Sequence, residues 1–311
     1  MQGGKGSVHY DLFVLGEALI DLVQQADGLF LPLSGGSPYN LCYAAALQGV
    51  KAGYLNPFST DPFGQTLRAQ LEKAGAHPLS TVTLRPTSLS LVTLVNGQPH
   101  YGFYREGIAD LDYREDDIIN LLNCHSPGVF HTGSLMAMPP QHERLLPILA
   151  AAKKRGWIIS VDVNVRSHMA ADIDAYLRAI QSIALYADWL KASDEDLRFL
   201  GFGTIDAANV AACAGVFRRQ ACSRIALTFG EKGAYLQVSD FGLFAPAPKI
   251  DVIDTIGAGD VFWATCLAEW ICHSDTTQEM QEVERVLQRA LQAAALNCTR
   301  AGCSPPQRYE L

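Results

Sequence analysis

The strongest constraint on the fold is an alternation along the chain between short apolar runs and longer stretches with helical spacing. The apolar runs that indicate buried strands are DLFVLG (11–16), VFHTGS (129–134), IISVDVN (158–164), ADWLKAS (187–193) and RIALTFG (224–230). Stretches between them, such as QHERLLPILAAAKKRG (141–156), place apolar residues at helical intervals. This alternation is typical of crossover units in a parallel sheet that carries helices on both faces. We therefore predict an α/β fold.

The composition narrows the class of protein. With 311 residues and 49% hydrophobic content, the chain can bury a large core, as one domain or as a domain with an appendage. The 24 Lys and Arg against 32 Asp and Glu give a net charge of −8, which argues against a nucleic-acid partner. No apolar run reaches the length of a bilayer span, and the opening MQGGKGSVHY lacks the apolar core of a signal peptide. We expect a cytoplasmic protein with no membrane partner.

Two early segments depart from the strand–helix alternation. The stretch 88–104, SLSLVTLVNGQPHYGFY, alternates around Asn96-Gly97, which is a strong hairpin signal. ALIDLVQQ (18–25) and LFLPLSGG (29–36) flank Asp27-Gly28 in the same manner. Two hairpins inserted into an α/β chain predict a small β-sheet over one end of the main domain. We expect this sheet to be a lid, formed discontinuously by about 17–34 and 87–109.

Polar residues follow several of the predicted strands. In open parallel sheets, ligands bind beyond the carboxyl ends of the strands, so these residues are candidates for a site. DVNVR places Asp162, Asn164 and Arg166 at alternate positions, which predicts that all three point to one side of a strand end. The planar cation of Arg166 suits a phosphate, although a salt bridge to a nearby Asp is an equally good interpretation. Lys191 and Ser193 follow the next strand.

The run DTIGAGD (254–260) lies between a strand-like stretch and the helix-like VFWATCLAEWICH. Gly257, Ala258 and Gly259 have almost no side-chain bulk, so an anion can approach the unpaired amides at the start of the helix. Asp260 would be an ordinary helix cap in the simplest interpretation. A cap needs no Gly-Ala-Gly before it, whereas a base beside an anion hole needs both features. We therefore favour a catalytic role for Asp260, and a turn or outer-shell metal role for Asp254.

Two further glycine-containing motifs are ambiguous on their own. GGSPYN (35–40) opens a helix-like stretch, and its glycines would let a ligand lie against the backbone while the Asn40 amide bonds hydroxyl groups. A tight turn with a helix cap explains it equally well. LTFGEKG (227–233) would let a nucleotide lie along the loop, or is a turn only. Neither a Walker A loop nor a strand-linked GxGxxG is present.

GGSPYN, DVNVR and DTIGAGD, in this order and spacing, resemble the signatures of the ribokinase-like, or phosphofructokinase-B, family of sugar kinases. The resemblance covers about Tyr10 to Gly302. It implies a Rossmann-like three-layer sandwich with a parallel-rich sheet and a small β-sheet lid, in a single domain over 1–311. It also implies transfer of the ATP γ-phosphate to a sugar hydroxyl, with Mg²⁺ on the nucleotide.

The resemblance implies a role for each matching position. Asp260 matches the catalytic base, Gly257, Ala258 and Gly259 match its anion hole, and Arg166 is expected to hold the phosphoryl charge. The substrate contacts are expected at Asp21, Gly35, Gly36, Asn40, Arg105 and Asn164. The nucleotide contacts are expected at Thr228, Gly230, Gly233, Lys191 and Ser193. Asp196 is expected to act on Mg²⁺ through water, and Asp251 on a monovalent cation such as K⁺.

Weaker cues concern the substrate. GEALIDL, FYREGIADLDY, HTGSL and DVNVR look most like fructokinases, while 2-keto-3-deoxygluconate kinases, ribokinases and nucleoside kinases are alternatives within the family. Ser193 and Asp196 stand where many relatives have Asn and Glu, and Leu291 stands near a usual Asn, so the magnesium and adenine contacts are expected to differ. A sensor that binds sugar without catalysis is the alternative outside the class. An exposed lid sheet also suggests a homodimer.

Overall fold

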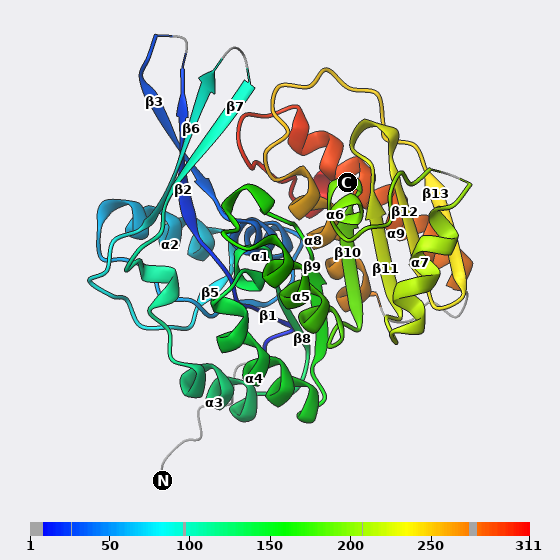
Figure 1. Ribbon diagram of the computed structural model, residues 1–311, viewed down its shortest axis with the longest axis horizontal. Coiled ribbons are helices and arrows are strands. Elements are labelled where there is room, and N and C mark those ends of the chain that lie inside the picture. The colour runs from blue at the N-terminus through cyan, green and yellow to red at the C-terminus, as the bar shows by residue number, and fades with distance from the viewer. Residues whose placement is uncertain (1–8, 26, 96–97, 207, 274–278) are drawn as a thin grey trace.

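The computed structural model describes residues 9–311 except 26, 96–97, 207 and 274–278 (Figure 1). Within them, one nine-stranded sheet has the order β13-β12-β11-β10-β9-β8-β1-β4-β5. These strands are β1 (Leu12–Val14), β4 (Ala52–Tyr54), β5 (His77–Pro78), β8 (Val129–Gly133), β9 (Ile158–Asp162), β10 (Trp189–Ser193), β11 (Arg224–Thr228), β12 (Ala234–Val238) and β13 (Phe241–Ala245). All neighbours from β5 to β11 pair in parallel, and β12 and β13 join antiparallel. The predicted parallel-rich sheet is confirmed.

The helices cover both faces of this sheet. They are α1 (Ser37–Leu47), α2 (Pro62–Ala74), α3 (Glu115–Cys124), α4 (Gln141–Lys154), α5 (Ile173–Ala184), α6 (Asp194–Phe199), α7 (Val210–Arg219), α8 (Ala258–Cys272) and α9 (Glu279–Cys298). Leu12 and Val14 of β1 pack into one apolar cluster with α1, α2, α8 and α9. Phe13, between them, packs into a second cluster with α3, α4, α5 and α7. Alternate residues of a buried strand thus serve opposite layers, which makes the three-layer sandwich.

A second, four-stranded sheet contains the two hairpins (Figure 1). Its order is β3-β2-β6-β7, with β2 (Leu19–Gln24), β3 (Phe30–Gly35), β6 (Ser88–Val95) and β7 (Gln98–Tyr104). β2 pairs antiparallel with β3, β6 pairs antiparallel with β7, and the parallel pair β2–β6 joins the hairpins. Both hairpins are confirmed, although the predicted Asn96-Gly97 turn lies outside the described residues. The extent of the lid and the single-domain assignment over 1–311 stay predictions.

The small sheet begins at the carboxyl edge of the large sheet. β1 ends at Val14 and β2 starts at Leu19, so the chain passes directly from one sheet to the other. β3 then ends at Gly35, and α1 returns to the main body from Ser37. In Figure 1 the small sheet projects outward beside α1 and α2. This connection places the hairpins next to the strand ends at which the predicted site residues lie.

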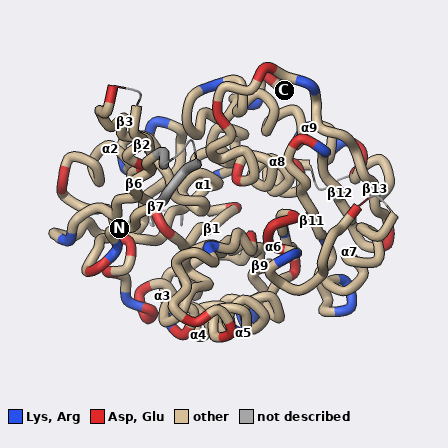
Figure 2. Tube along the Cα trace, turned by 45° about the horizontal axis from the view of Figure 1, so that its top comes forward, with Lys and Arg blue, Asp and Glu red and all other residues tan. Residues whose placement is uncertain are grey.

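Two properties of the whole chain bear on its surroundings. No helix in the described residues is both long and apolar enough to cross a membrane. Figure 2 shows Lys and Arg interspersed with Asp and Glu along the trace. The net charge of −8 is therefore made up of mixed charges along the chain.

Candidate active site

Asp260 lies in the first turn of α8 and is buried, with 8% of its surface exposed. Its two carboxylate oxygens accept different hydrogen bonds: Oδ1 from the Ser37 hydroxyl at 2.7 Å, and Oδ2 from the Asn40 amide at 2.9 Å. Burial raises the pKa of Asp260, and these two hydrogen bonds oppose the rise. The geometry holds the carboxylate in one orientation. It also makes Asp260 a better proton acceptor than an exposed aspartate, since the basicity of a carboxylate increases with its pKa.

The loop before Asp260 is shaped by residues with little or no side chain. Gly257 caps α8 with φ 74°, a left-handed conformation that favours glycine, and a Cβ there would lie 2.5 Å from the Cys303 sulfur. The Ala258 amide donates to the Thr255 carbonyl at 3.2 Å, so this amide is already engaged. Asp254 accepts hydrogen bonds from main-chain amides of its own turn and of the loop at residue 302. The turn role predicted for Asp254 agrees with these contacts, and its outer-shell metal role is untested.

The GGSPYN motif brings a second set of polar groups to Asp260. Gly36 has φ 102°, and a Cβ there would lie 2.4 Å from the Glu17 carbonyl oxygen, so the close approach requires glycine. A Cβ at Gly35 would lie 2.2 Å from Asp21 Oδ2, which places the Asp21 carboxylate against the motif. Burial raises the pKa of Asp21, and the charge of Asp260 also raises it. The motif is therefore both a helix start and part of the cluster around Asp260.

Arg166 is a cation whose charge reaches three of these carboxylates, together with Lys191 at Asp260 and Arg105 at Glu17. Its charge lowers the pKa of Asp260, Asp21 and Glu17, in each case against the larger effect of burial. Its Nη1 donates to the Val165 carbonyl at 3.1 Å. Within the described part of the chain, Arg166 forms no ion pair within 4 Å. The salt-bridge interpretation is thus not supported, and the guanidinium remains able to pair with an anion.

The strict alternation predicted for DVNVR is wrong. β9 ends at Asp162, and Asn164 has φ 40°, so the extended geometry does not continue through the motif. Asp162 instead pairs with Lys191, whose Nζ donates to both carboxylate oxygens at 2.9 Å. Burial alone would lower the pKa of Lys191, but the neighbouring carboxylates raise it above its usual value. A Cβ at Gly259 would lie 3.2 Å from Lys191 Nζ, so the ammonium lies beside the start of α8.

Ser193 and Asp196 form a capping box at the start of α6. Asp196 Oδ2 accepts from the main-chain amide and the hydroxyl of Ser193 at 2.6 and 2.8 Å, and Oδ1 accepts from the Val165 amide at 2.6 Å. Asp196 therefore links the end of β10 to the segment that follows β9. Because both oxygens accept hydrogen bonds from the protein, the predicted action of Asp196 on Mg²⁺ would run through water.

The remaining predicted residues lie at the ends of other strands and in loops. Thr228 ends β11 in register with Ser193, and the loop that follows is closed by a hydrogen bond from the Gly233 amide to the Gly230 carbonyl at 3.2 Å. Arg105 follows β7 and pairs with the buried Asp110 at 2.9 Å, so its charge is partly committed. Asp251 is exposed on the loop before α8. No group of three or more His, Cys, Asp or Glu that could bind a metal occurs among the described residues.

Sequence reasoning assigned no role to two residues of the cluster, Ser37 and Glu17. Ser37 lies in the GGSPYN motif, so its position at a helix start could be predicted from the sequence. Glu17 directly follows the first predicted strand, but its burial could not be predicted from the sequence. Glu17 is 2% exposed, its Oε1 accepts from the Ser37 amide at 3.4 Å, and its Oε2 has no hydrogen-bond partner within the described residues. Burial raises its pKa to about 7, against the opposing charge of Arg105.

This raised pKa predicts a pH-dependent stability. A carboxyl whose pKa rises on folding contributes stability at low pH, and that contribution is lost as the pH rises through the folded pKa of about 7. Glu17→Gln removes the titration. Wild type should lose stability relative to Glu17→Gln as the pH rises. The difference in unfolding free energy between the two proteins should shift in favour of the variant by about 2–3 kcal/mol from about pH 5 to about pH 8, measured by urea unfolding. The exposed Glu72→Gln variant is the control, and pH curves for Glu17→Gln that run parallel to wild type would contradict the assignment.

The chain is similar to a known protein family and to several named proteins. Residues 11–308 match the model of the pfkB family of carbohydrate kinases. A fructokinase from Rhizobium leguminosarum bv. trifolii is 31% identical over 264 residues, 81% of this chain and 77% of the relative. A probable fructokinase-2 from Arabidopsis thaliana is 30% identical over 302 residues, 93% of this chain and 90% of the relative.

Solved structures share the fold. The fructokinase of Vibrio cholerae O395, in a fructose, ADP and calcium ion bound form, superposes with a TM-score of 0.80 at 23% identity, over 94% of each chain. The fructokinase of Xylella fastidiosa with bound ATP has a TM-score of 0.78 at 24% identity, over 94% of this chain and 93% of that one. Taken with the family match over nearly the full length, these similarities show that the chain belongs to the pfkB family of carbohydrate kinases.

Proposed function

We propose that this carbohydrate kinase transfers the γ-phosphate of ATP to a hydroxyl of fructose. The observation that carries the proposal is the buried Asp260 carboxylate at the start of α8, with Arg166 close enough to act on it. The two relatives described above, at 31% and 30% identity, are named fructokinase and probable fructokinase-2, which supports fructose as the sugar. A cytoplasmic location, where ATP is supplied, belongs to the same proposal.

In the proposed reaction Asp260 accepts the proton of the attacking sugar hydroxyl. The hydroxyl oxygen forms a bond to the γ-phosphorus as the bond from that phosphorus to the bridging oxygen breaks, and ADP leaves with the electron pair. The amides of Gly257 and Gly259 and the Arg166 guanidinium stabilise the charge on the phosphoryl oxygens. Such a transfer asks the protein mainly for positioning and electrostatic stabilisation. Ala258 contributes its small size, because its own amide is bonded to Thr255.

The sugar is proposed to bind between Asp260 and the small sheet. Asn40 and Ser37, which hydrogen-bond Asp260 in this structure, carry groups that can also bond sugar hydroxyls. Asp21, with Gly35 and Gly36 beside it, offers a further acceptor. The two hairpins would act as the lid that excludes water, a competing acceptor for the phosphoryl group. Arg105, whose charge acts on Glu17, and Asn164 are also proposed as substrate contacts.

ATP is proposed to lie along the carboxyl ends of β10 and β11. Thr228, Gly230 and Gly233 would line the nucleotide, while Lys191 and Ser193 would act mainly by shaping this edge, since both are engaged with carboxylates. A Mg²⁺ here would be held mostly by phosphates and water, as is usual for this ion, with Asp196 reached through water. A monovalent cation such as K⁺ near Asp251 remains part of the proposal.

The proposal is tested by measuring ADP release with ATP, Mg²⁺ and a panel of acceptors. The panel contains fructose, ribose, 2-keto-3-deoxygluconate and nucleosides. We expect the highest kcat/KM with fructose, and no ADP release above background without an acceptor. A higher kcat/KM with another acceptor would reject fructose and keep the kinase. Sugar binding by calorimetry without ADP release on any acceptor would instead support a non-catalytic sensor.

Arg166→Ala should impair phosphate handling more than sugar binding. Removing a charge-assisted donor to a phosphoryl group lowers kcat by about tenfold or more, because such bonds contribute about 1.5–3 kcal/mol. The fructose Kd, measured by calorimetry, should change little. Arg68→Ala, on the exposed face of α2, is the matched control. Equal losses in phosphoryl transfer and in fructose affinity would show that Arg166 does not act on phosphate in particular.

A homodimer through the small sheet is also proposed. The β3 edge carries the exposed apolar residues Leu29, Phe30 and Leu31, at 68%, 40% and 44% exposure. An edge strand with exposed apolar side chains is a favourable surface for pairing with a second copy. Small-angle scattering should give the mass of two chains, and Leu31→Lys should reduce it to one. A monomer at all concentrations would reject the dimer.

A further inference from the structure

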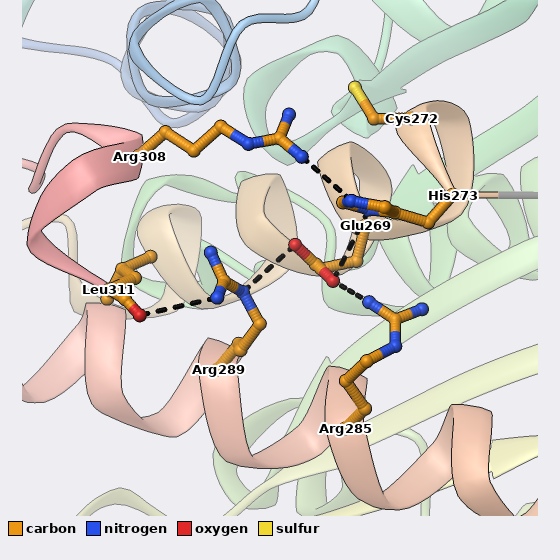
Figure 3. Close-up of a pocket in the computed structure, with 7 residues that line it drawn as sticks. All are labelled: Glu269, Cys272, His273, Arg285, Arg289, Arg308 and Leu311. Carbon is orange, nitrogen blue, oxygen red and sulfur yellow. Dashed lines mark hydrogen bonds and ion pairs between the residues drawn. The ribbon is translucent and has the colours of Figure 1, made fainter.

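A pocket of about 640 Å³ lies away from Asp260, between the end of α8, the side of α9 and the 3₁₀ turn Arg308–Glu310 (Figure 3). Its lining is Glu269, Cys272, His273, Arg285, Arg289, Arg308 and Leu311. Glu269 follows Asp260 by nine residues on α8, which is about 14 Å along a helix axis. None of these lining residues belongs to the site proposed for phosphoryl transfer.

Positive charge exceeds negative charge in the lining of this pocket. Glu269 is 5% exposed and pairs with Arg285, with Arg289 Nε at 3.0 Å and with His273 at 3.6 Å. Figure 3 shows Arg285 and Arg289 reaching Glu269 from α9, while Arg308 approaches from the opposite wall. Three guanidinium groups therefore line the pocket with a single side-chain carboxylate, and Arg289 Nη1 also donates to a main-chain oxygen of Leu311 at 3.3 Å. This local excess is unusual in a chain with a net charge of −8.

Arg308 carries most of the uncompensated charge. Within the described residues it forms no ion pair within 4 Å, and its guanidinium donates to His273 Nε2 at 2.8 Å and to the Gln48 carbonyl at 3.3 Å. A histidine that accepts at Nε2 is the neutral tautomer. Burial and the charge of Arg308 lower the pKa of His273, in agreement with that state. Arg308 is thus a cation whose two hydrogen-bond acceptors, His273 and the Gln48 carbonyl, are uncharged.

A second guanidinium is also incompletely satisfied. Arg285 Nη2 is buried and has no hydrogen-bond acceptor among the described residues. A buried donor without an acceptor costs free energy, and a donor on a charged group costs more. A network that served only to fasten α8 to α9 through Glu269 would not require Arg308, which, among the described residues, contacts neither Glu269 nor α9 by hydrogen bond or ion pair. The surplus donors point to an acceptor that the protein itself does not supply.

We propose that this pocket binds a small phosphate-bearing anion. Planar guanidinium groups from two walls present donors in several directions, which suits the oxygens of a tetrahedral phosphate. A volume of about 640 Å³ is of the size that small metabolites occupy. Cys272 and the Leu311 side chain add an apolar part to the lining, so a phosphate ester can also be accommodated. The ligand chemistry is a phosphate group, whether free or esterified.

The test is isothermal titration calorimetry of the whole chain with inorganic phosphate, against chloride at matched ionic strength. Glycerol 3-phosphate and glycerol are titrated in parallel, to distinguish an ester from free phosphate and to show that the phosphate group is needed. We expect Arg308→Gln and Arg285→Gln each to weaken phosphate binding by about tenfold, the effect of losing one charge-assisted hydrogen bond. Arg68→Gln, an exposed arginine paired on α2, should bind like wild type.

The Arg166→Gln variant distinguishes phosphate that binds in this pocket from phosphate that binds near Asp260. Under our proposal this variant binds phosphate in the pocket as wild type does, while Arg308→Gln binds it about tenfold more weakly. The reverse result, or the absence of phosphate binding at millimolar concentration, would overturn the proposal. Arg308 is exposed, so its variant should keep the fold, which far-UV circular dichroism verifies. Tenfold weakening in Arg308→Gln with an unchanged spectrum therefore supports the site directly.

Discussion

Asp260→Asn should lower kcat by at least about a hundredfold, the usual scale for the loss of a general base. The asparagine amide has nearly the same shape, so it can still occupy the position beside Ser37 and Asn40. It cannot accept a proton at neutral pH. The decrease should therefore be seen in kcat, measured by ADP release, while fructose and ATP still bind by calorimetry.

The control for this variant is Asp240→Asn, an exposed aspartate that pairs with Arg218 far along the sheet. It should have the activity of wild type. If Asp260→Asn turned over at the wild-type rate, the catalytic role of this carboxylate would be excluded. A loss of both activity and fold, seen by circular dichroism, would be resolved with Asp260→Glu, which keeps the charge and should retain some turnover.

Lys191→Met should destabilise the protein by about 3–5 kcal/mol, because it leaves the buried Asp162 without its cation. Lys191 and Asp162 are 5% and 2% exposed, and Nζ bonds both carboxylate oxygens. An uncompensated charge at this depth is costly, whereas the methionine itself fits the space of the lysine side chain. Urea unfolding, followed by tryptophan fluorescence, measures the difference.

The double variant Lys191→Met with Asp162→Leu tests the cause. Replacing a whole buried ion pair with apolar residues is often neutral, so the double variant should recover most of the stability lost in Lys191→Met. A double variant as unstable as the sum of the single ones would show that the two residues act independently. Because the Lys191 ammonium lies beside Gly259, the activity of each variant should also be measured at a temperature where it and the wild type are folded.

The α/β class and both hairpins could be predicted because their signals are local. Buried strands give continuous apolar runs, as in Val129–Gly133, and a turn signal between two strand-like runs predicts a hairpin. Asp260 could be selected as a candidate for the same reason, since a helix start with small residues is a feature of seven consecutive positions. Local sequence also predicted that GGSPYN begins a helix.

Local sequence patterns thus predict where strands and helices form and which residue types lie at the strand ends. The partners of these residues follow from the folded chain: Ser37 and Asn40 bond Asp260 across more than 200 residues, Asp162 pairs with Lys191 rather than with Arg166, and Glu17 is buried. The order of strands in the sheet sets these pairs, and burial and charge at a site depend on neighbours that no local pattern specifies. The arginine-lined pocket between α8 and α9 is visible for the same reason only after the helices have packed.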